Sequence, residues 1–185
     1  MPMEELEAIY TYKLAANVTW PHEKQIKQFN ITLFGGKTTF KKAFIKKLSR
    51  DKLKNAPINI RQVHSIDQLK SPHVIFVSAD KHKIFPQLFE KMEGKAVLLI
   101  THMYNNQRLV MINLITKNNN VSFEINKANI LNNGLDTKPA LILAGGKEID
   151  VARLYRKGQK SLSSLESRLR LQEKQLSQLK QNIDQ

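Results

Sequence analysis

Two glycine pairs that precede a lysine are the residues of this chain most suggestive of chemistry, Phe34-Gly-Gly-Lys-Thr38 and Ala144-Gly-Gly-Lys-Glu148. The order Gly-Lys-Thr ends a phosphate-binding loop, in which backbone amides and the lysine hold phosphate oxygens. Such a loop also needs a glycine five positions before Gly36, and Ile31 occupies that place. We therefore interpret segment 34–38 as a turn between a strand and a helix, not as a nucleotide site.

The other side chains that could bind a metal or act as nucleophiles form no recognisable site. The chain has no cysteine, which excludes disulfides, thiolate metal sites and cysteine nucleophiles. The histidines show no spacing typical of paired metal ligands; they are His22, His64, His73, His82 and His102. Ser78-Ala-Asp80 follows a predicted strand, where α/β proteins often bind ligands, but no nucleophile elbow surrounds it. We expect no catalytic residue, no metal and no cofactor, and hence no enzyme.

Positive charge is concentrated in one part of the chain. The net charge is +14, and between Lys37 and Lys54 there are seven lysines and one arginine against Asp51 alone. One interpretation is a nucleic-acid or anionic-membrane partner. The other is an amphipathic helix whose lysines are solvated while Phe40 and Phe44 are buried. Because no arginine-rich or glycine-aromatic RNA motif accompanies the lysines, we favour the helix and do not expect a nucleic-acid partner.

Hydrophobic patterning predicts the elements that would position these side chains. Strands are predicted at 29–34, 58–63, 73–77 and 96–100, and helices at 4–19, 38–49, 66–70 and 82–92. Continuous apolar runs such as 73–77 are typical of strands covered on both faces, as in a parallel sheet. Segments 109–116 and 121–125 flank Lys117-Asn-Asn-Asn120 and predict an antiparallel hairpin. Further helices are predicted from Asn126 to Asn132 and from about Thr137.

This order of elements predicts the fold class. Strand–helix units followed by a hairpin and then by helices indicate a three-layer, Rossmann-like α/β sandwich with a mostly parallel sheet and one antiparallel hairpin. We divide the chain into an α/β domain at 1–148 and a coiled-coil helix at 149–185.

A heptad pattern runs through the last part of the chain. Its members alternate spacings of four and three: Val151, Tyr155, Gly158, Leu162, Leu165, Leu169, Gln172, Leu176, Leu179 and Ile183. This spacing keeps one side of a helix facing a partner helix. Burying each leucine is worth roughly 1.5–3 kcal/mol, so a single helix would not leave the stripe in water. We expect a parallel homodimer, which Gly158 and Gln172 keep weak enough to change its pairing.

Three ordered stretches resemble one known family. An opening helix from Leu6 ends at Trp20-Pro21; Met111-Ile-Asn-Leu-Ile115 precedes Phe123-Glu-Ile-Asn126; and Ala128, Gly134-Leu135 and Leu141-Ile-Leu-Ala144 follow. Together they are similar to the YfiR-like family of bacterial periplasmic regulators. We expect Trp20, Phe123 and Ile125 to point into the core. Glu124 and Asn126 are the polar members, and Asn126 is expected to cap the helix after it rather than to contact a ligand.

The resemblance implies an exported Rossmann-like domain that acts by binding rather than by catalysis. Such domains occur as free repressors of inner-membrane diguanylate cyclases and as N-terminal input modules of sensor histidine kinases. The chain starts without a signal peptide and has no apolar run long enough to cross a membrane. These observations alone leave open a cytosolic protein or one whose targeting segment is absent from this chain. Because the resemblance implies export, we expect a periplasmic domain that is tethered to the inner membrane in a longer protein.

Combining the domain with the heptad helix gives a functional hypothesis. We expect a non-catalytic extracytoplasmic input domain that binds a small-molecule ligand or a partner. The signal would pass through the coiled coil to a membrane-anchored histidine kinase or diguanylate cyclase, in the same or another chain. Two alternatives stay open: a free-standing periplasmic repressor of a membrane diguanylate cyclase, and a basic nucleic-acid-binding dimer. Ligand-binding residues are not predicted.

Overall fold

The computed structural model describes residues 1–118, 120–144 and 146–183, and the chain divides into two units, Met1–Ile149 and Asp150–Gln185. Within the described residues the first unit contains an eight-stranded sheet in the order β10-β8-β7-β6-β5-β2-β4-β3. Its strands are β2 Phe29–Phe34, β3 Lys52–Leu53, β4 Ala56–Val63, β5 Val74–Val77, β6 Leu98–His102, β7 Ile112–Lys117, β8 Asn120–Ile125 and β10 Gly146–Glu148.

The sheet is mostly parallel. Within this eight-stranded sheet, the described strands pair antiparallel at β7 with β8 and at β3 with β4. All four residues of β5 are buried, as expected for a strand with both faces covered. The predicted α/β class, the mostly parallel sheet, the antiparallel hairpin and the C-terminal helix are thus confirmed. The hairpin turn includes residue 119, which lies outside the described residues.

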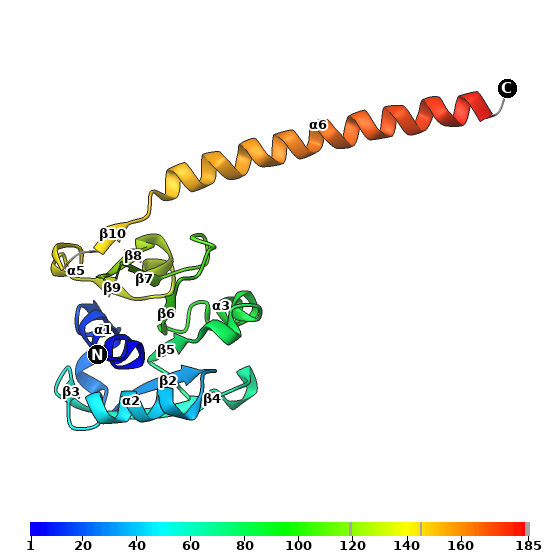
Figure 1. Cartoon of the computed structure of the whole chain (residues 1–185). Coiled ribbons are helices and arrows are strands. Elements are labelled where there is room, and N and C mark those ends of the chain that lie inside the picture. The colour runs from blue at the N-terminus through cyan, green and yellow to red at the C-terminus, as the bar shows by residue number, and fades with distance from the viewer. Residues whose placement is uncertain (119, 145, 184–185) are drawn as a thin grey trace. The chain divides into compact units, whose positions relative to one another are not determined.

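Helices cover the sheet and join its strands (Figure 1). They are α1 Met3–Ala16, α2 Thr38–Leu48, α3 Phe85–Met92, α4 Lys127–Asn132 and α5 Ala140–Leu143, with short 3-10 turns η1 Glu23–Gln25, η2 Ile66–Gln68 and η3 Ala79–Lys81. The basic helix α2 lies along β2 and β4, and α1 packs beside it (Figure 1). Two ion pairs join the helices, since Glu5 contacts both Lys46 and Lys47.

The core is rich in phenylalanine. Phe40 and Phe44 of α2 pack on Phe76 of β5, with ring centroids 5.4 and 5.7 Å from it. Leu48 completes the buried side of α2, while Lys42 and Lys46 are exposed. The amphipathic interpretation of the basic segment is therefore confirmed.

Several predicted boundaries were wrong, each for a local reason. The helix predicted to reach residue 19 ends at Ala16, because β1 Val18–Thr19 pairs with β9 Asp136–Thr137. The strand predicted from residue 96 starts at Leu98, because Ala96 has a φ of 53° and cannot continue a strand. The helix predicted from residue 82 starts at Phe85, where Pro86 fits its first turn.

The second unit consists of helix α6, Val151–Ile183. Asp150 begins it, since its Oδ1 accepts a hydrogen bond of 2.9 Å from the amide of Arg153, as a side chain at a helix N-cap does. Across the described residues, we find no helix that combines the length and the apolar character needed to cross a membrane.

Candidate functional site

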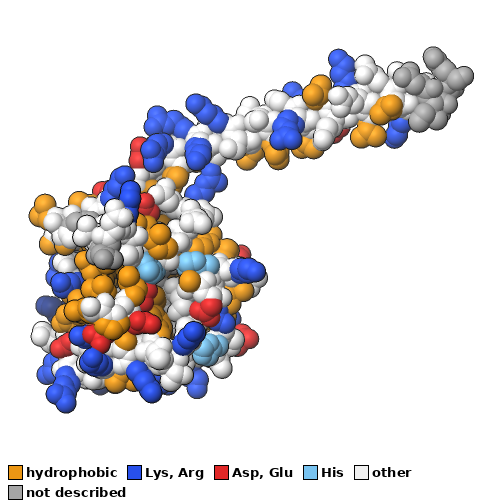
Figure 2. Space-filling view, in the orientation of Figure 1, with side chains coloured by type: hydrophobic (Ala, Val, Ile, Leu, Met, Phe, Trp, Pro, Cys, Tyr) orange, Lys and Arg blue, Asp and Glu red, His pale blue; other side chains and the backbone are white. Residues whose placement is uncertain are grey.

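The heptad leucines of α6 are exposed in the single chain. Leu162, Leu165, Leu169, Leu176 and Leu179 have exposed fractions of 52–64%. Tyr155 is 68% and Val151 is 42% exposed, whereas the side chain of Ile183 lies outside the described part. We call these residues, together with Gly158 and Gln172, the α6 seam. Figure 2 shows hydrophobic side chains gathered along one side of the middle of this helix. Apolar surface of this kind marks an interaction site.

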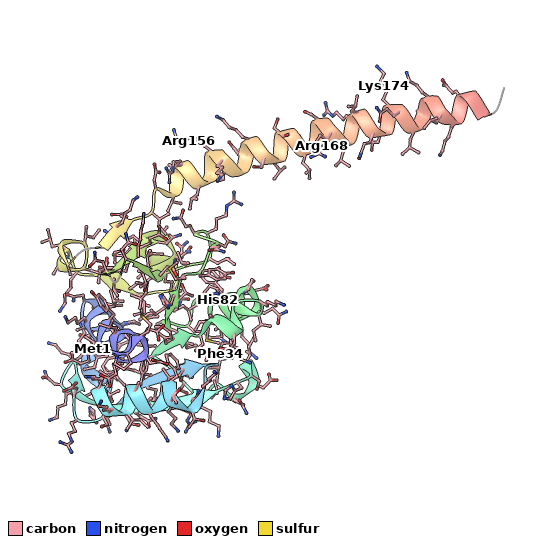
Figure 3. The ribbon with its side chains drawn as sticks, in the orientation of Figure 1. Met1, Phe34, His82, Arg156, Arg168 and Lys174 are labelled. Carbon is pink, nitrogen blue, oxygen red and sulfur yellow. The ribbon has the colours of Figure 1, made fainter. Side chains whose placement is uncertain are left out.

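Charged residues occupy the remaining sides of α6. The basic ones are Arg153, Arg156, Lys157, Lys160, Arg168, Arg170, Lys174 and Lys180, and the acidic ones are Glu166 and Glu173. Arg168 lies on the middle part of α6 (Figure 3) and precedes the seam residue Leu169 in the sequence. Glu173 follows the seam residue Gln172. Charges that flank a coiled-coil seam determine orientation and partner choice.

The residues from Phe123 to Asn126 end β8 and begin α4. Phe123 and Ile125 are 2% and 1% exposed, so they lie in the core as predicted. Oε1 of Glu124 accepts a hydrogen bond of 2.8 Å from Gln107. Oδ1 of Asn126 accepts a 3.2 Å hydrogen bond from the amide of Asn129, so Asn126 caps α4 as predicted. These polar side chains therefore hold the loop before β7 in place.

Trp20 is buried as predicted, with 4% of its surface exposed. Its ring meets the edge of Phe29 at a centroid distance of 5.2 Å, and its amide donates a 3.1 Å hydrogen bond to Glu23. The buried indole Nε1 has no hydrogen-bond partner among the described residues. A buried donor without an acceptor is uncommon in folded proteins, so this indole is a feature that needs an explanation.

Trp20 and Pro21 also line a pocket of about 650 Å³ at the amino ends of β5 and β6. We call it the Trp20 pocket. Its other lining residues are Ile26, Ile66, Asp67, Leu69, Ser71, Pro72, His73, Lys91, Met92, Lys95, Ala96 and Val97. This volume falls in the range of small-molecule sites, roughly 300–1,000 Å³. No sequence pattern indicates this pocket, because its walls come from segments between residues 20 and 97 that only the fold brings together.

A smaller pocket, of about 190 Å³, lies at the opposite, carboxyl edge of the sheet. The chain adds β4 on one side of β2 and then β5 and β6 on the other, so the strand order reverses between β2 and β5. Ligands of α/β proteins commonly bind at such a reversal. Phe34 ends β2, and His82 follows β5 near the same edge (Figure 3). The pocket is lined by Glu4, Glu7, Gly36, Lys37, Thr39, Phe40, Phe76, Ser78, Ala79 and His102.

The glycine loop beside this smaller pocket is not built to hold phosphate. The amide of Gly36 donates a 3.0 Å hydrogen bond to Asp80, and a carboxylate there occupies the place that an anion would need. Nε2 of Gln62 donates to the carbonyl oxygens of Gly35, Gly36 and Lys37. The hydrogen bonds to Asp80 and from Gln62 together fix the loop as a strand-to-helix turn. The second glycine pair includes Gly145, which lies outside the described residues.

Burial shifts the pKa values of groups near both pockets. Burial, aided by the charge of His102, lowers the pKa of His82 against the opposing effect of Asp80. Burial alone lowers the pKa of His73. Burial also raises the pKa of Tyr104, whose ring meets that of His82 edge-on. In both histidines, burial thus favours the neutral form of the imidazole.

These groups do not assemble a catalytic constellation. Ser78 has a buried hydroxyl with no hydrogen-bond partner in the described part of the chain, so no base activates it there. His102 is engaged on both ring nitrogens, by Glu7 and Thr116 at 2.8 Å each. The described residues also contain no group of three His, Asp or Glu side chains that could hold a metal ion.

Comparison with known proteins identifies a relationship for the first unit. The model of the YfiR/HmsC-like family matches residues 4–144, a range that includes both pockets and the Phe123–Asn126 turn. No curated protein sequence matches the chain. The match ends before α6 begins at Val151.

Proposed function

Because the chain belongs to the YfiR/HmsC-like family, we propose that it is a non-catalytic, periplasmic regulatory domain whose signal leaves through α6. The family is one of periplasmic regulators, and residues 4–144 carry its domain. In this proposal the α/β domain, with the three layers of a Rossmann-like sandwich, binds a ligand or partner. The α6 helices of two copies then change their pairing.

The exposed α6 seam is the observation that carries this proposal. Its five leucines remain 52–64% exposed in the single chain, and burying about half of a leucine is worth on the order of 1 kcal/mol. A second α6 packed in parallel would cover the whole stripe as a coiled coil. Gly158 and Gln172 bury little apolar surface at their seam positions, so the pairing would be weak enough to respond to the domain.

The effector in this proposal is a membrane-anchored enzyme, either a histidine kinase or a diguanylate cyclase. It would lie in the same chain in a longer protein, or in another chain. Support comes from the position of α6 directly after the family domain, where a signal-transmitting helix would have to start.

A second candidate is a free-standing repressor that binds a membrane diguanylate cyclase directly. The match to residues 4–144 favours it, because the family domain is present without any contribution from α6. A nucleic-acid-binding role is weakened by the ion pairs that hold Lys46 and Lys47 against Glu5. The shared Glu5 carboxylate offsets one of these two positive charges, which weakens the attraction of the basic helix for an external phosphate backbone.

The proposal is tested by the mass of the whole chain in solution. Light scattering should give a dimer for the unchanged protein and a monomer for the variant Leu165→Lys/Leu169→Lys, which places charges in the seam. Leu171 is 58% exposed but lies off the seam, so Leu171→Lys is the matched control and should remain a dimer. A monomer for the unchanged protein, over the micromolar range, would refute the pairing.

A further inference from the structure

The lining of the Trp20 pocket combines apolar and polar surface in about equal parts. Ile26, Leu69, Met92 and Val97 are among its apolar members. A pocket of about 650 Å³ with both kinds of surface suits a small molecule that has an apolar part and a polar group.

A hydrogen-bond donor belongs to the lining of this pocket. His73 lines the pocket, and its Nδ1 accepts a 3.0 Å hydrogen bond from the amide of Asn30. An accepting ring nitrogen carries no proton, so the neutral ring has its proton on Nε2 and donates from there. This donor favours a ligand with an acceptor oxygen.

The charges at the pocket are predominantly positive. Lys91 and Lys95 both line it and are exposed. Asp67 is the acidic residue among the lining side chains, and it lies 3.7 Å from Lys91 with its own side chain 92% exposed. Two ammonium groups against one solvated carboxylate leave an excess of one positive charge, which favours an anion at the mouth of the pocket.

The pocket rim also carries backbone strain. Ser71 and Ala96 both line it and have φ values of 42° and 53°, a region that side-chain-bearing residues rarely adopt. Hydrogen bonds hold them there, from Asn30 to the carbonyl of Ser71 and from the amide of Ala96 to Asn133, each 3.0 Å. Strain of this kind is concentrated at ligand sites, where the surrounding structure fixes a binding geometry.

From these four observations we propose that the Trp20 pocket binds a small apolar carboxylate. The apolar part lies against the walls, and the carboxylate accepts from His73 and lies near Lys91 and Lys95. The inference rests on the proposed regulatory function for its biological purpose, because it names the ligand class that the domain senses. The ligand class itself is inferred from the residues of the pocket alone.

The single tryptophan of the chain makes a direct test possible, since all indole fluorescence comes from Trp20. We expect titration of the full chain with sodium octanoate to give a saturable change in this emission. 1-Octanol, which has the same apolar chain without the charge, should bind about tenfold more weakly. Lys91→Gln/Lys95→Gln should weaken octanoate about tenfold and leave octanol unchanged. Lys83→Gln, at an exposed lysine outside the lining, is the control.

Each outcome decides one part of the inference. The absence of a saturable change with octanoate would overturn the site, and octanol binding as tightly as octanoate would overturn the anionic class. Light scattering of the same samples separates the site from the function: a monomer that binds octanoate refutes the pairing of α6 and supports the pocket. A dimer that does not bind octanoate refutes the pocket alone.

Discussion

Nδ1 of His102 lies 2.8 Å from Oε1 of Glu7, which joins α1 to the carboxyl end of β6. The other ring nitrogen lies 2.8 Å from the hydroxyl of Thr116 on β7. The side chains of Glu7 and His102 are 11% and 21% exposed, so water reaches them little. Three elements are thereby tied together through one imidazole, beside the smaller of the two pockets.

Removal of the Glu7 carboxylate should therefore destabilise the domain. We expect Glu7→Ala to lower the free energy of unfolding by about 2 kcal/mol, because it leaves a half-buried imidazole without its partner. Urea denaturation at pH 7 measures this. Glu4→Ala, in the same helix, should change stability by less than about 0.5 kcal/mol. The double variant Glu7→Ala/His102→Ala should lose less than the sum of the single losses, and strict additivity would contradict the coupling.

The ion pairs of Glu5 predict an acid-sensitive contact between α1 and α2. Hydrogen bonds from Lys46, and next from Lys47, lower the pKa of Glu5 from 4.5 to about 2. Since the unfolded chain binds the proton at higher pH than the folded one, the stabilisation is complete above pH 4.5 and is lost as the pH falls toward 2.

A comparison of two proteins at two pH values checks this contact. Between pH 6 and pH 3 the unchanged protein should lose more unfolding free energy than Glu5→Gln, whose side chain does not titrate. Unfolding in urea at each pH gives both losses. Equal losses in the two proteins would show that the lysines do not lower the pKa of Glu5.

The parts of the fold that could be predicted have strong periodic signals. Segment 29–34 places apolar residues at positions 29, 31, 33 and 34 and forms β2 with the predicted bounds, and the 3.6-residue pattern of α2 placed its buried side correctly. The strands β3, β9 and β10 have two or three residues each. Strands this short form only because a neighbouring strand offers its backbone, so their own residues carry no periodicity.

Local backbone geometry was the second reason why predicted element boundaries differed from the structure. Lys54 and Asn55 join β3 to β4 with φ values of 52° and 69°, the conformation of a tight hairpin turn. Asn55 is a recognised signal for it, but Lys54 is not. For the sites, the α6 seam was visible as a heptad pattern. The Trp20 pocket was not, because it depends on which loops the sheet order places together.

Gly146 gives a prediction about the edge strand β10 that the sequence did not reveal. A Cβ atom there would lie 2.6 Å from the ring of Phe123 and 3.1 Å from the carbonyl oxygen of Leu141. We expect Gly146→Ala to cost about 1–3 kcal/mol, the usual range for overpacking. Thermal and urea unfolding measure the cost. Cδ1 of Ile125 would lie 2.8 Å from the same Cβ atom, so the background Phe123→Leu/Ile125→Val removes both clashing side-chain atoms. In that background Gly146→Ala should cost clearly less, and an undiminished cost would refute the steric explanation.

Asn126 gives a prediction that separates two roles of one side chain. Its Oδ1 caps α4 through the amide of Asn129, while its Nδ2 donates a 3.1 Å hydrogen bond to the carbonyl of Gln107. We expect Asn126→Ala to destabilise by about 1–2 kcal/mol. Asn126→Asp keeps the capping oxygen and loses the donor, so its loss should be measurable but smaller. A loss for Asp as large as that for Ala would assign the stability to the Gln107 contact instead.

Charges beside the α6 seam predict the orientation of the proposed dimer. Arg168 precedes the seam residue Leu169, and Glu173 follows the seam residue Gln172. In a parallel, in-register coiled coil, the position of Arg168 in one helix meets the position of Glu173 in the other. Arg168 would then face Glu173 of the second copy, twice in the dimer. Exposed pairs are worth about 0.2–1 kcal/mol each, so Arg168→Glu or Glu173→Arg alone should weaken the dimer roughly tenfold by replacing attraction with repulsion.

The combined variant Arg168→Glu/Glu173→Arg distinguishes the orientations. In a parallel pair it restores both contacts with the signs exchanged, so its dissociation constant should return to within about threefold of the unchanged protein. In an antiparallel pair, positions equivalent to Arg168 face each other and positions equivalent to Glu173 face each other. Exchanging the two charges would then restore no attraction between the helices. Sedimentation equilibrium measures the dimer dissociation constant of the unchanged protein, the two single variants and the combined variant. Arg170→Glu, on the outer side of α6, is the control for the change in net charge. A combined variant as weak as the single ones would exclude the parallel pairing on which the proposed signal transmission through α6 depends.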